Sequence, residues 1–201
     1  MNEQVSGLSP ELRVDARTAV IAFSRPAQRN RLSTDVLSRL RQVVEQVEID
    51  SGVDSIVFTG SGSTFAAGAD LKQVAALSRP EALEFGRFGQ TVLGKVRRSR
   101  KLTIAAVNGF CMGGALDLAM SCDMRIAAEK AVFSHPGVSL GIITGWGGTQ
   151  MLPSLVGLKN AYRILLTADR IEAQEALRIG LIDEISVDPL ERSLEIAGGR
   201  I

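Results

Sequence analysis

The sequence predicts an α/β fold in which short buried strands lead through glycine turns into helices. Residues 103–123, TIAAVNGFCMGGALDLAMSCD, show this arrangement most clearly. The first five of them are β-branched or alanine, which predicts a buried strand, and the Asn-Gly pair at 108–109 marks a turn. The glycines at 113–114 then open an apolar segment suited to a helix packed on that strand. We therefore expect the turn to end at a helix N-terminus.

A second stretch repeats this arrangement. Residues 55–59 predict a strand, and after a loop residues 67–71 predict the entry into a helix. The first N–H groups of a helix lack intrahelical partners and carry the positive end of its dipole. Two such turns can aim the N–H groups of Ala69 and Gly114 at one oxygen. That arrangement would be an oxyanion hole, in which losing one donor typically costs about 100- to 1,000-fold in rate.

At the N-terminus we expect a loose arm over residues 1–10 and then a β-hairpin formed by residues 11–15 and 18–23. Ser24-Arg25-Pro26 ends the hairpin. The next segment predicts one amphipathic helix that begins at an N-cap, Ser33 or Thr34, and ends near Asp50. Its apolar residues at helical spacing are Val36, Leu37, Leu40, Val43, Val44 and Val47.

Residues 80–101 predict a further helix with Pro80 in its first turn. Five basic residues gather near its end, where they complement the helix dipole, although a phosphate or subunit contact stays open. Short strands are expected at 124–127 and 131–134, followed by a loop over 135–148. The remaining helices are predicted at 149–156, 159–168 and 173–179, and an exit turn and a short strand follow them.

Length and composition limit the function classes. A chain of 201 residues fits one domain, here 1–201, in which 149–201 form a short C-terminal helical part. The net charge of +1 provides no overall field for nucleic acid, and the start of the sequence has neither a signal peptide nor a long apolar run. We therefore expect a cytoplasmic protein without nucleic-acid or membrane partners. Cys111 and Cys122 lack metal-ligand spacing, so we expect them in the core and expect no metal.

Three ordered motifs make the chain resemble a known family. They are STFAAGADLK at 63–72, AAVNGFCMGG at 105–114 and GWGGTQ at 145–150. Together they resemble the crotonase, or enoyl-CoA hydratase/isomerase, superfamily, and the match runs in order from about residue 25 to residue 185. The resemblance implies a crotonase-like (ClpP/crotonase) fold of repeated ββα units, with a shortened C-terminal helical region in this chain. It also implies an acyl-CoA substrate, no separate cofactor, and a homotrimer or dimer of trimers.

The resemblance further assigns site residues. The catalytic residues would be Ala69 and Gly114, whose N–H groups hold the thioester oxygen, and Asp117, which transfers a proton. The segment after the arginine-proline turn would touch the nucleotide of CoA, although a solvated basic loop explains its arginines equally well. The residues implied in CoA or substrate binding are Arg25, Arg29, Ala67, Ala69, Asp70, Leu71, Lys72, Gly113 and Gly114. For Asp70, a helix N-cap is the favoured role over chemistry.

The proton-transfer groups depart from the family pattern. In the hydratases two carboxylates divide the work, whereas this sequence has Asp117 in place of the usual glutamate and Gly137 in place of the second carboxylate. Asp117 is one methylene shorter than glutamate, and its place near a helix N-terminus favours the anion unless burial opposes the dipole. A first-turn aspartate that only complements the dipole is the alternative. His135 and Trp146 are expected to have structural roles before catalytic or pocket-lining ones.

Three function hypotheses follow. The first is an enzyme of the enoyl-CoA hydratase/isomerase type that works through a thioester enolate. The second is a non-catalytic acyl-CoA-binding or assembly protein, favoured by Gly137 and by a short C-terminal part that would leave the site open unless a neighbouring subunit closes it. The third is a dinucleotide-binding oxidoreductase, suggested by Gly60-Ser61-Gly62 after a strand. It is the weakest, because Phe65 occupies the place of the third glycine of the dinucleotide fingerprint.

Overall fold

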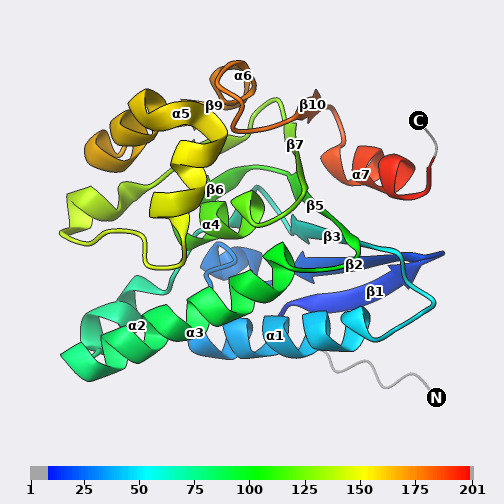
Figure 1. Cartoon of the computed structure of the whole chain (residues 1–201), viewed down its shortest axis with the longest axis horizontal. Coiled ribbons are helices and arrows are strands. Elements are labelled where there is room, and N and C mark those ends of the chain that lie inside the picture. The colour runs from blue at the N-terminus through cyan, green and yellow to red at the C-terminus, as the bar shows by residue number, and fades with distance from the viewer. Residues whose placement is uncertain (1–8, 200–201) are drawn as a thin grey trace.

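The computed structural model describes residues 9–199, and most of the predicted arm lies outside this range. Its larger sheet contains six strands in the order β1-β2-β3-β5-β7-β10 (Figure 1). Strands β1 and β2 form the predicted antiparallel hairpin, and each later strand runs parallel to its neighbour. The strands are β1 (Glu11–Asp15), β2 (Thr18–Phe23), β3 (Ser55–Gly60), β5 (Leu102–Val107), β7 (Met124–Ala128) and β10 (Glu184–Ser186).

The second sheet consists of four very short strands in the order β4-β6-β8-β9. They are β4 (Thr64–Ala66), β6 (Phe110–Met112), β8 (Val132–Ser134) and β9 (Ile171–Glu172). Strands β4, β6 and β8 run parallel to one another, while β9 is antiparallel to β8. Each of the first three follows a strand of the larger sheet along the chain, so the chain alternates between the two sheets.

Helices cover both faces of the larger sheet. They are α1 (Thr34–Glu48), α2 (Leu71–Ala76), α3 (Arg79–Arg97), α4 (Gly114–Met120), α5 (Gly148–Thr167), α6 (Ala173–Arg178) and α7 (Pro189–Ala197), with 3-10 turns at Pro26–Gln28 (η1) and Pro136–Leu140 (η2). Helix α1 packs against α3 (Figure 1), and all six apolar residues predicted to share one face of α1 are buried. Ser33 is its N-cap.

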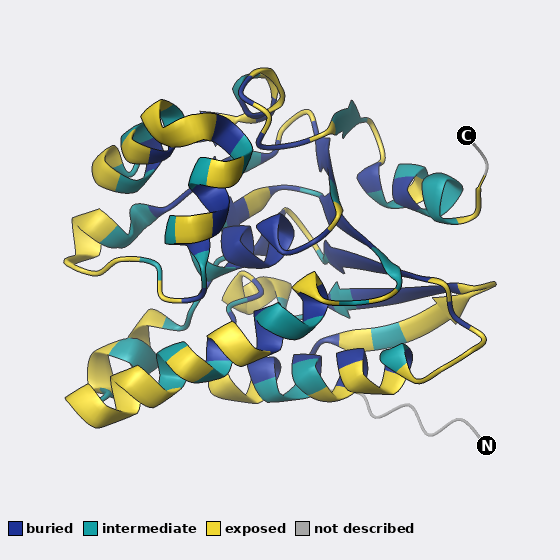
Figure 2. Cartoon of the chain, in the orientation of Figure 1, coloured by how far each residue is buried: buried dark blue, intermediate teal, exposed yellow. Residues whose placement is uncertain are grey.

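The two faces of the larger sheet have separate cores because successive strand residues point to opposite sides. Ile21 and Phe58 belong to the core shared with α1, α3 and α4, whereas Val20 and Val57 belong to the core on the other face. Helix α7 covers that second face through Leu190 and Leu194. In Figure 2, α4 lies at the centre of the molecule and is buried after its first residue, which fits the 0 to 6% exposure of its residues 115–120.

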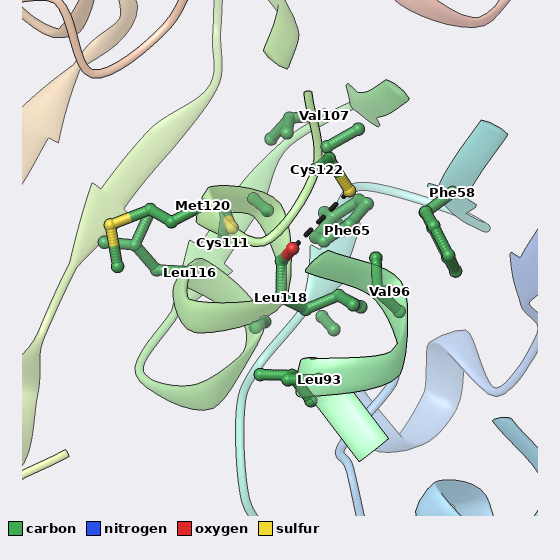
Figure 3. Close-up of a cluster of buried hydrophobic side chains, with 14 of the residues drawn as sticks. Phe58, Phe65, Leu93, Val96, Val107, Cys111, Leu116, Leu118, Met120 and Cys122 are labelled. Atoms are coloured by element: carbon green, nitrogen blue, oxygen red, sulfur yellow. Dashed lines mark hydrogen bonds between the residues drawn. The ribbon is translucent and has the colours of Figure 1, made fainter. Parts of the chain in front are cut away.

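The centre of the main core includes both cysteines. Figure 3 shows Cys111 and Cys122 among the side chains of β3, β4, α3 and α4, and the Cys122 thiol lies 3.5 Å from the carbonyl oxygen of Leu118. Both are buried, free cysteines. Burial raises the pKa of the Cys111 and Cys122 thiols well above the usual value, so both remain neutral. The core role predicted for them is confirmed.

Some predicted boundaries differ from the structure. Helix α3 ends at Arg97 instead of residue 101, and the ammonium group of Lys101 binds the carbonyl oxygens of Asp50 and Val53 beyond that end. The helices predicted at 149–156 and 159–168 follow one another as α5, which breaks at Gly157, where φ is 75°. None of the helices between residues 9 and 199 is both long and apolar enough to cross a membrane.

Candidate active site

The candidate site lies where three parallel strands of the smaller sheet end. Because β4, β6 and β8 run the same way, the residues that follow them meet at one edge of the sheet. Strand β4 leads to Ala67, β6 to Gly113, and β8 to His135. The N–H of Gly113 donates to the carbonyl oxygen of Ser134 at 2.9 Å and so joins the last two of these segments.

The two predicted oxyanion donors come from the first two of these segments. Gly114 is the first residue of α4, so its N–H lacks an intrahelical acceptor. Ala69 lies just before Asp70, the N-cap of α2, whose carboxylate accepts from the N–H of Lys72 at 3.1 Å. The predicted cap is confirmed. A Cβ on Gly68 would lie 3.0 Å from the backbone nitrogen of Gly114, so the structure brings the turns around Ala69 and Gly114 into contact.

A cavity of about 250 Å³ opens at this edge. Of the residues assigned from the resemblance, it is lined by Ala67, Ala69, Leu71, Gly113, Gly114 and Asp117. Its other walls come from α3 through Phe85 and from the loop after β8 through Ile142, Ile143 and Trp146. The lining is predominantly apolar, as in most small-molecule sites, and its polar side chains are those of Asp117, His135 and Thr144.

Asp117 is fully buried in the wall of the cavity. Its Oδ2 accepts a hydrogen bond from the hydroxyl of Thr144, whereas its Oδ1 has no hydrogen-bond partner. Burial raises the pKa of Asp117 to about 7, and hydrogen bonding from Thr144 and from the backbone N–H of Trp146 opposes this shift only in part. This carboxyl is therefore poised to take up or release a proton near neutral pH.

His135, the only histidine in the chain, faces Asp117. Its Nε2 lies 3.3 Å from Oδ1 of Asp117, and its side chain is 3% exposed. Neither of these two atoms has a hydrogen-bond partner of acceptable geometry. Burial lowers the pKa of His135 to about 4, so the imidazole is neutral at pH 7. The structure places this residue in the cavity wall, a position for which its sequence context carries no signal.

Trp146 both packs and lines the cavity. A Cβ on Gly89 would lie 2.1 Å from the indole nitrogen, and one on Gly114 would lie 2.2 Å from the far side of the indole ring. The ring also contacts Phe85 edge to face, with the ring centroids 5.4 Å apart. Two glycines therefore make the slot for the indole, which stays 6% exposed at the cavity. The loop is held further by Gln90, whose amide donates to the carbonyl oxygen of Gly145 at 2.7 Å.

Gly137, where the resemblance implies a second carboxylate in the hydratases, has no room for a side chain. A Cβ on Gly137 would lie 2.7 Å from the carbonyl oxygen of Ile142, whose N–H donates to the carbonyl of Gly137 at 3.0 Å. The loop after β8 closes on itself at this point. The close approach of Gly137 and Ile142 therefore leaves no space for a carboxylate side chain at residue 137.

The charged residues assigned to CoA or substrate binding do not line the cavity. Arg25 pairs with Asp35 at 2.8 Å, and Asp70 pairs with Arg31 at 3.0 Å. Arg29 and Lys72 are exposed. The backbone of Arg29 nevertheless lies next to the cavity wall, because the N–H of Ala67, which lines the cavity, donates to the carbonyl oxygen of Arg29 at 3.0 Å.

Thr144 is a site residue that sequence reasoning missed. It lies in a glycine-rich loop, and only the fold brings its hydroxyl to Asp117, 27 residues earlier. Likewise, the residues on either side of His135, Ser134 and Pro136, do not indicate that its side chain faces Asp117 in α4. By contrast, Gly60-Ser61-Gly62 leads into strand β4 and not into a helix, which removes the main support for a dinucleotide site.

Comparison with known proteins identifies the family to which this arrangement belongs. Residues 13–195 match the family model described as enoyl-CoA hydratase/isomerase. The chain belongs to this family. The crotonyl-CoA hydratase of Syntrophomonas wolfei is 46% identical over 94% of this chain and 74% of its own length. The short-chain-enoyl-CoA hydratase of Clostridium acetobutylicum is 42% identical over 90% of this chain and 69% of its own length.

Solved structures confirm the predicted fold class. The enoyl-CoA hydratase from Bacillus anthracis matches with a TM-score of 0.90 and 34% identity, covering 94% of this chain and 75% of that structure. The enoyl-CoA hydratase from Thermoplasma volcanium matches with a TM-score of 0.92 and 33% identity, covering 96% and 78%. The chain is thus an enzyme of the enoyl-CoA hydratase/isomerase type, and the non-catalytic alternative is not favoured.

Proposed function

We propose that this chain binds an enoyl-CoA thioester in the cavity and adds water across its double bond or moves that bond. The observation that carries the proposal is the meeting of the Ala69 and Gly114 turns beside the buried carboxyl of Asp117. The two N–H groups would hold the thioester oxygen as it gains negative charge, and Asp117 would transfer a proton at the carbon skeleton. Each N–H donor of such a site is worth about 100- to 1,000-fold in rate.

A short acyl group suits this cavity best. Its volume of about 250 Å³ lies below the range of about 300 to 1,000 Å³ usual for drug-sized ligands. The edge-to-face pair of Phe85 and Trp146 lies in its wall and limits its extent. Two similar proteins are named for crotonyl-CoA and for short-chain enoyl-CoA, which agrees with this choice.

The nucleotide of CoA would lie along the turn that precedes Ala67. Arg29 and Lys72 are exposed there and are free to meet phosphates without breaking the pairs that Arg25 and Asp70 form. We propose these four residues as the outer part of the CoA site. The homotrimer or dimer of trimers expected from the resemblance belongs to the same proposal, and a native mass measurement tests it.

The first test uses a panel of saturated and unsaturated acyl-CoA thioesters in heavy water, with products read by mass spectrometry. We expect deuterium uptake or hydration with short-chain substrates, and the labelled carbon will identify the reaction. Asp117→Asn should lower the rate about 100-fold or more, because general acid or base catalysis contributes about 100- to 10,000-fold. Full turnover by Asp117→Asn on every active substrate would refute the role of Asp117.

Two controls make the result specific. Asp15→Asn removes a carboxylate from exposed strand β1 and should leave the rate unchanged. Trp146 is the only tryptophan in the chain, so its fluorescence reports binding of a saturated acyl-CoA to the cavity without turnover. Saturable binding, with neither deuterium uptake nor hydration of any thioester, would mean that the protein binds acyl-CoA without catalysing a reaction.

A further inference from the structure

Two unsatisfied buried atoms face each other in the cavity wall. Oδ1 of Asp117 comes from α4, and Nε2 of His135 comes from the residue that follows β8. They are 3.3 Å apart, and both lack a hydrogen-bond partner. A buried polar atom without a partner costs about 1 to 3 kcal/mol, so two facing atoms of this kind call for an explanation.

A single proton between the two atoms satisfies both. Two bare acceptors would repel each other in a site that excludes water, and so would a protonated carboxyl facing an Nε2–H group. With one proton between the two atoms, either the carboxylic acid donates to a bare Nε2 or the Nε2–H group of the imidazole donates to the carboxylate. The geometry therefore favours a pair that holds one proton and can carry it on either side.

We propose that His135 is the second proton-transfer group of this site, paired with Asp117 in place of the carboxylate that Gly137 excludes. The inference rests on the proposed function, because it assigns the second proton of that reaction. His135 lies two residues before Gly137, on the same segment, and lines the same cavity as Asp117.

A hydration cycle that uses this pair returns both groups to their starting protonation states. The cycle begins with the shared proton on the carboxyl of Asp117 and with a neutral imidazole, in keeping with the two pKa values. His135 takes a proton from water as the water oxygen bonds to the β-carbon, and the electron pair of the double bond moves to the thioester oxygen as an enolate. The carboxyl of Asp117 then gives its proton to the α-carbon as the enolate collapses. The pair is left with one proton, which returns from His135 to Asp117.

The surroundings of the pair support one shared proton. Burial raises the pKa of Asp117 to about 7 and lowers the pKa of His135 to about 4, so between these values the pair holds one proton. The other titratable group identified near Asp117 is the thiol of Cys111, which stays neutral. Thr144 from the loop before α5 is not titratable and donates only to Oδ2.

Because the chain has a single histidine, the pair can be tested without turnover. We would label the imidazole of the tag-free protein with ¹⁵N and follow its NMR shifts between pH 4 and 9 in the wild type and in Asp117→Asn. We expect the wild-type imidazole to show an inflection near pH 7, where Asp117 titrates, and Asp117→Asn to lose it. Identical curves in the two proteins would overturn the pairing.

The catalytic role is tested with His135→Gln, whose amide can still accept a hydrogen bond near the position of Nε2 but cannot carry a proton. We expect kcat for hydration to fall about 100-fold or more, KM to change less than about threefold, and the pH profile to change shape. Wild-type kcat and pH profile in His135→Gln would overturn the proposal and leave the proposed function intact. A wild type without turnover on any thioester would instead refute the proposed function, and this inference with it.

Discussion

A Cβ built on Gly148 would lie 2.2 Å from Oδ1 of Asp117. The carboxyl therefore reaches across the cavity wall to the first turn of α5 and occupies the space that any other residue at 148 would need. The same imaginary atom would lie 3.1 Å from the ring of His135. A side chain at residue 148 would therefore displace both Asp117 and His135.

Gly148→Ala should consequently impair activity and stability together. Overpacking of a tight site costs about 1 to 3 kcal/mol, and a displacement of about 1 Å at a reacting group costs about 100-fold in rate. Gly145→Ala is the matched control for stability, because a Cβ there meets no atom within 4 Å. Urea unfolding and kcat/KM measure the two effects. Equal stability of the two variants would contradict the close approach of Gly148 and Asp117.

The dependence of stability on pH should reveal the opposite shifts of Asp117 and His135. Asp117 has a raised pKa, so its stabilising contribution is present at low pH and is lost as pH rises through about 7. His135 has a lowered pKa, so its contribution is present above about pH 6.5 and is lost as pH falls toward about 4. Between about pH 4 and 6.5 the two slopes oppose each other and largely cancel.

Asp117→Asn removes the part of the pH dependence of stability that comes from Asp117. We expect the free energy of unfolding of this variant to rise with pH between about 4 and 6.5, by up to about 1.4 kcal/mol per pH unit, whereas the wild type changes little there and loses stability only as pH rises from about 6.5 through about 7. Urea unfolding at a series of pH values measures both curves. Parallel curves for the two proteins would show that Asp117 is not buried as a neutral acid.

The sequence predicted the helices and strands that are long enough to show a periodic pattern of apolar residues. The six apolar residues of α1 repeat at helical spacing, and all of them are buried. The strand at 103–107 and the turn to Gly114 were predicted because β-branched residues, alanine and glycine each restrict the backbone in a known way. These elements also position Ala69, Gly114 and Asp117, so much of the site architecture followed from local patterns.

The second sheet was mostly beyond such reasoning. Strands β4, β6 and β9 contain only two or three residues each, too few for an alternation of polar and apolar side chains to appear. Phe110–Met112 stands between the Asn-Gly pair at 108–109 and the glycine pair at 113–114 and resembles a continuing turn. Contacts between distant segments, such as His135 with Asp117 and Thr144 with Asp117, depend on the pairing of these strands and left no local pattern.

Helix α3 offers two glycines with opposite expected effects. Gly86 meets no atom within 4 Å of a built Cβ, so Gly86→Ala should stabilise the protein by about 0.5 to 1 kcal/mol through helix propensity. Gly89→Ala places its methyl group 2.1 Å from the indole of Trp146, which cannot withdraw because Gly114 lies against its other side. It should destabilise the protein and shift the tryptophan fluorescence. Thermal unfolding of both variants tests the packing of Trp146 in one comparison.

Gly137→Glu tests whether the second hydratase carboxylate can simply be restored. A Cβ at this position would lie 2.7 Å from the backbone oxygen of Ile142, and backbone atoms cannot withdraw as a flexible side chain can. We expect the variant to lose stability and to gain no hydration activity, because the loop must open before a glutamate can enter.

Gly137→Ala separates the two causes of such a loss. Alanine adds the same Cβ without a charge, so a steric origin predicts similar losses of stability for both variants in urea unfolding. A large loss confined to the glutamate would instead indicate the cost of burying a charge. Higher kcat for hydration in Gly137→Glu would show that the loop after β8 accommodates a carboxylate. The loop geometry would then not be the reason that this chain lacks one.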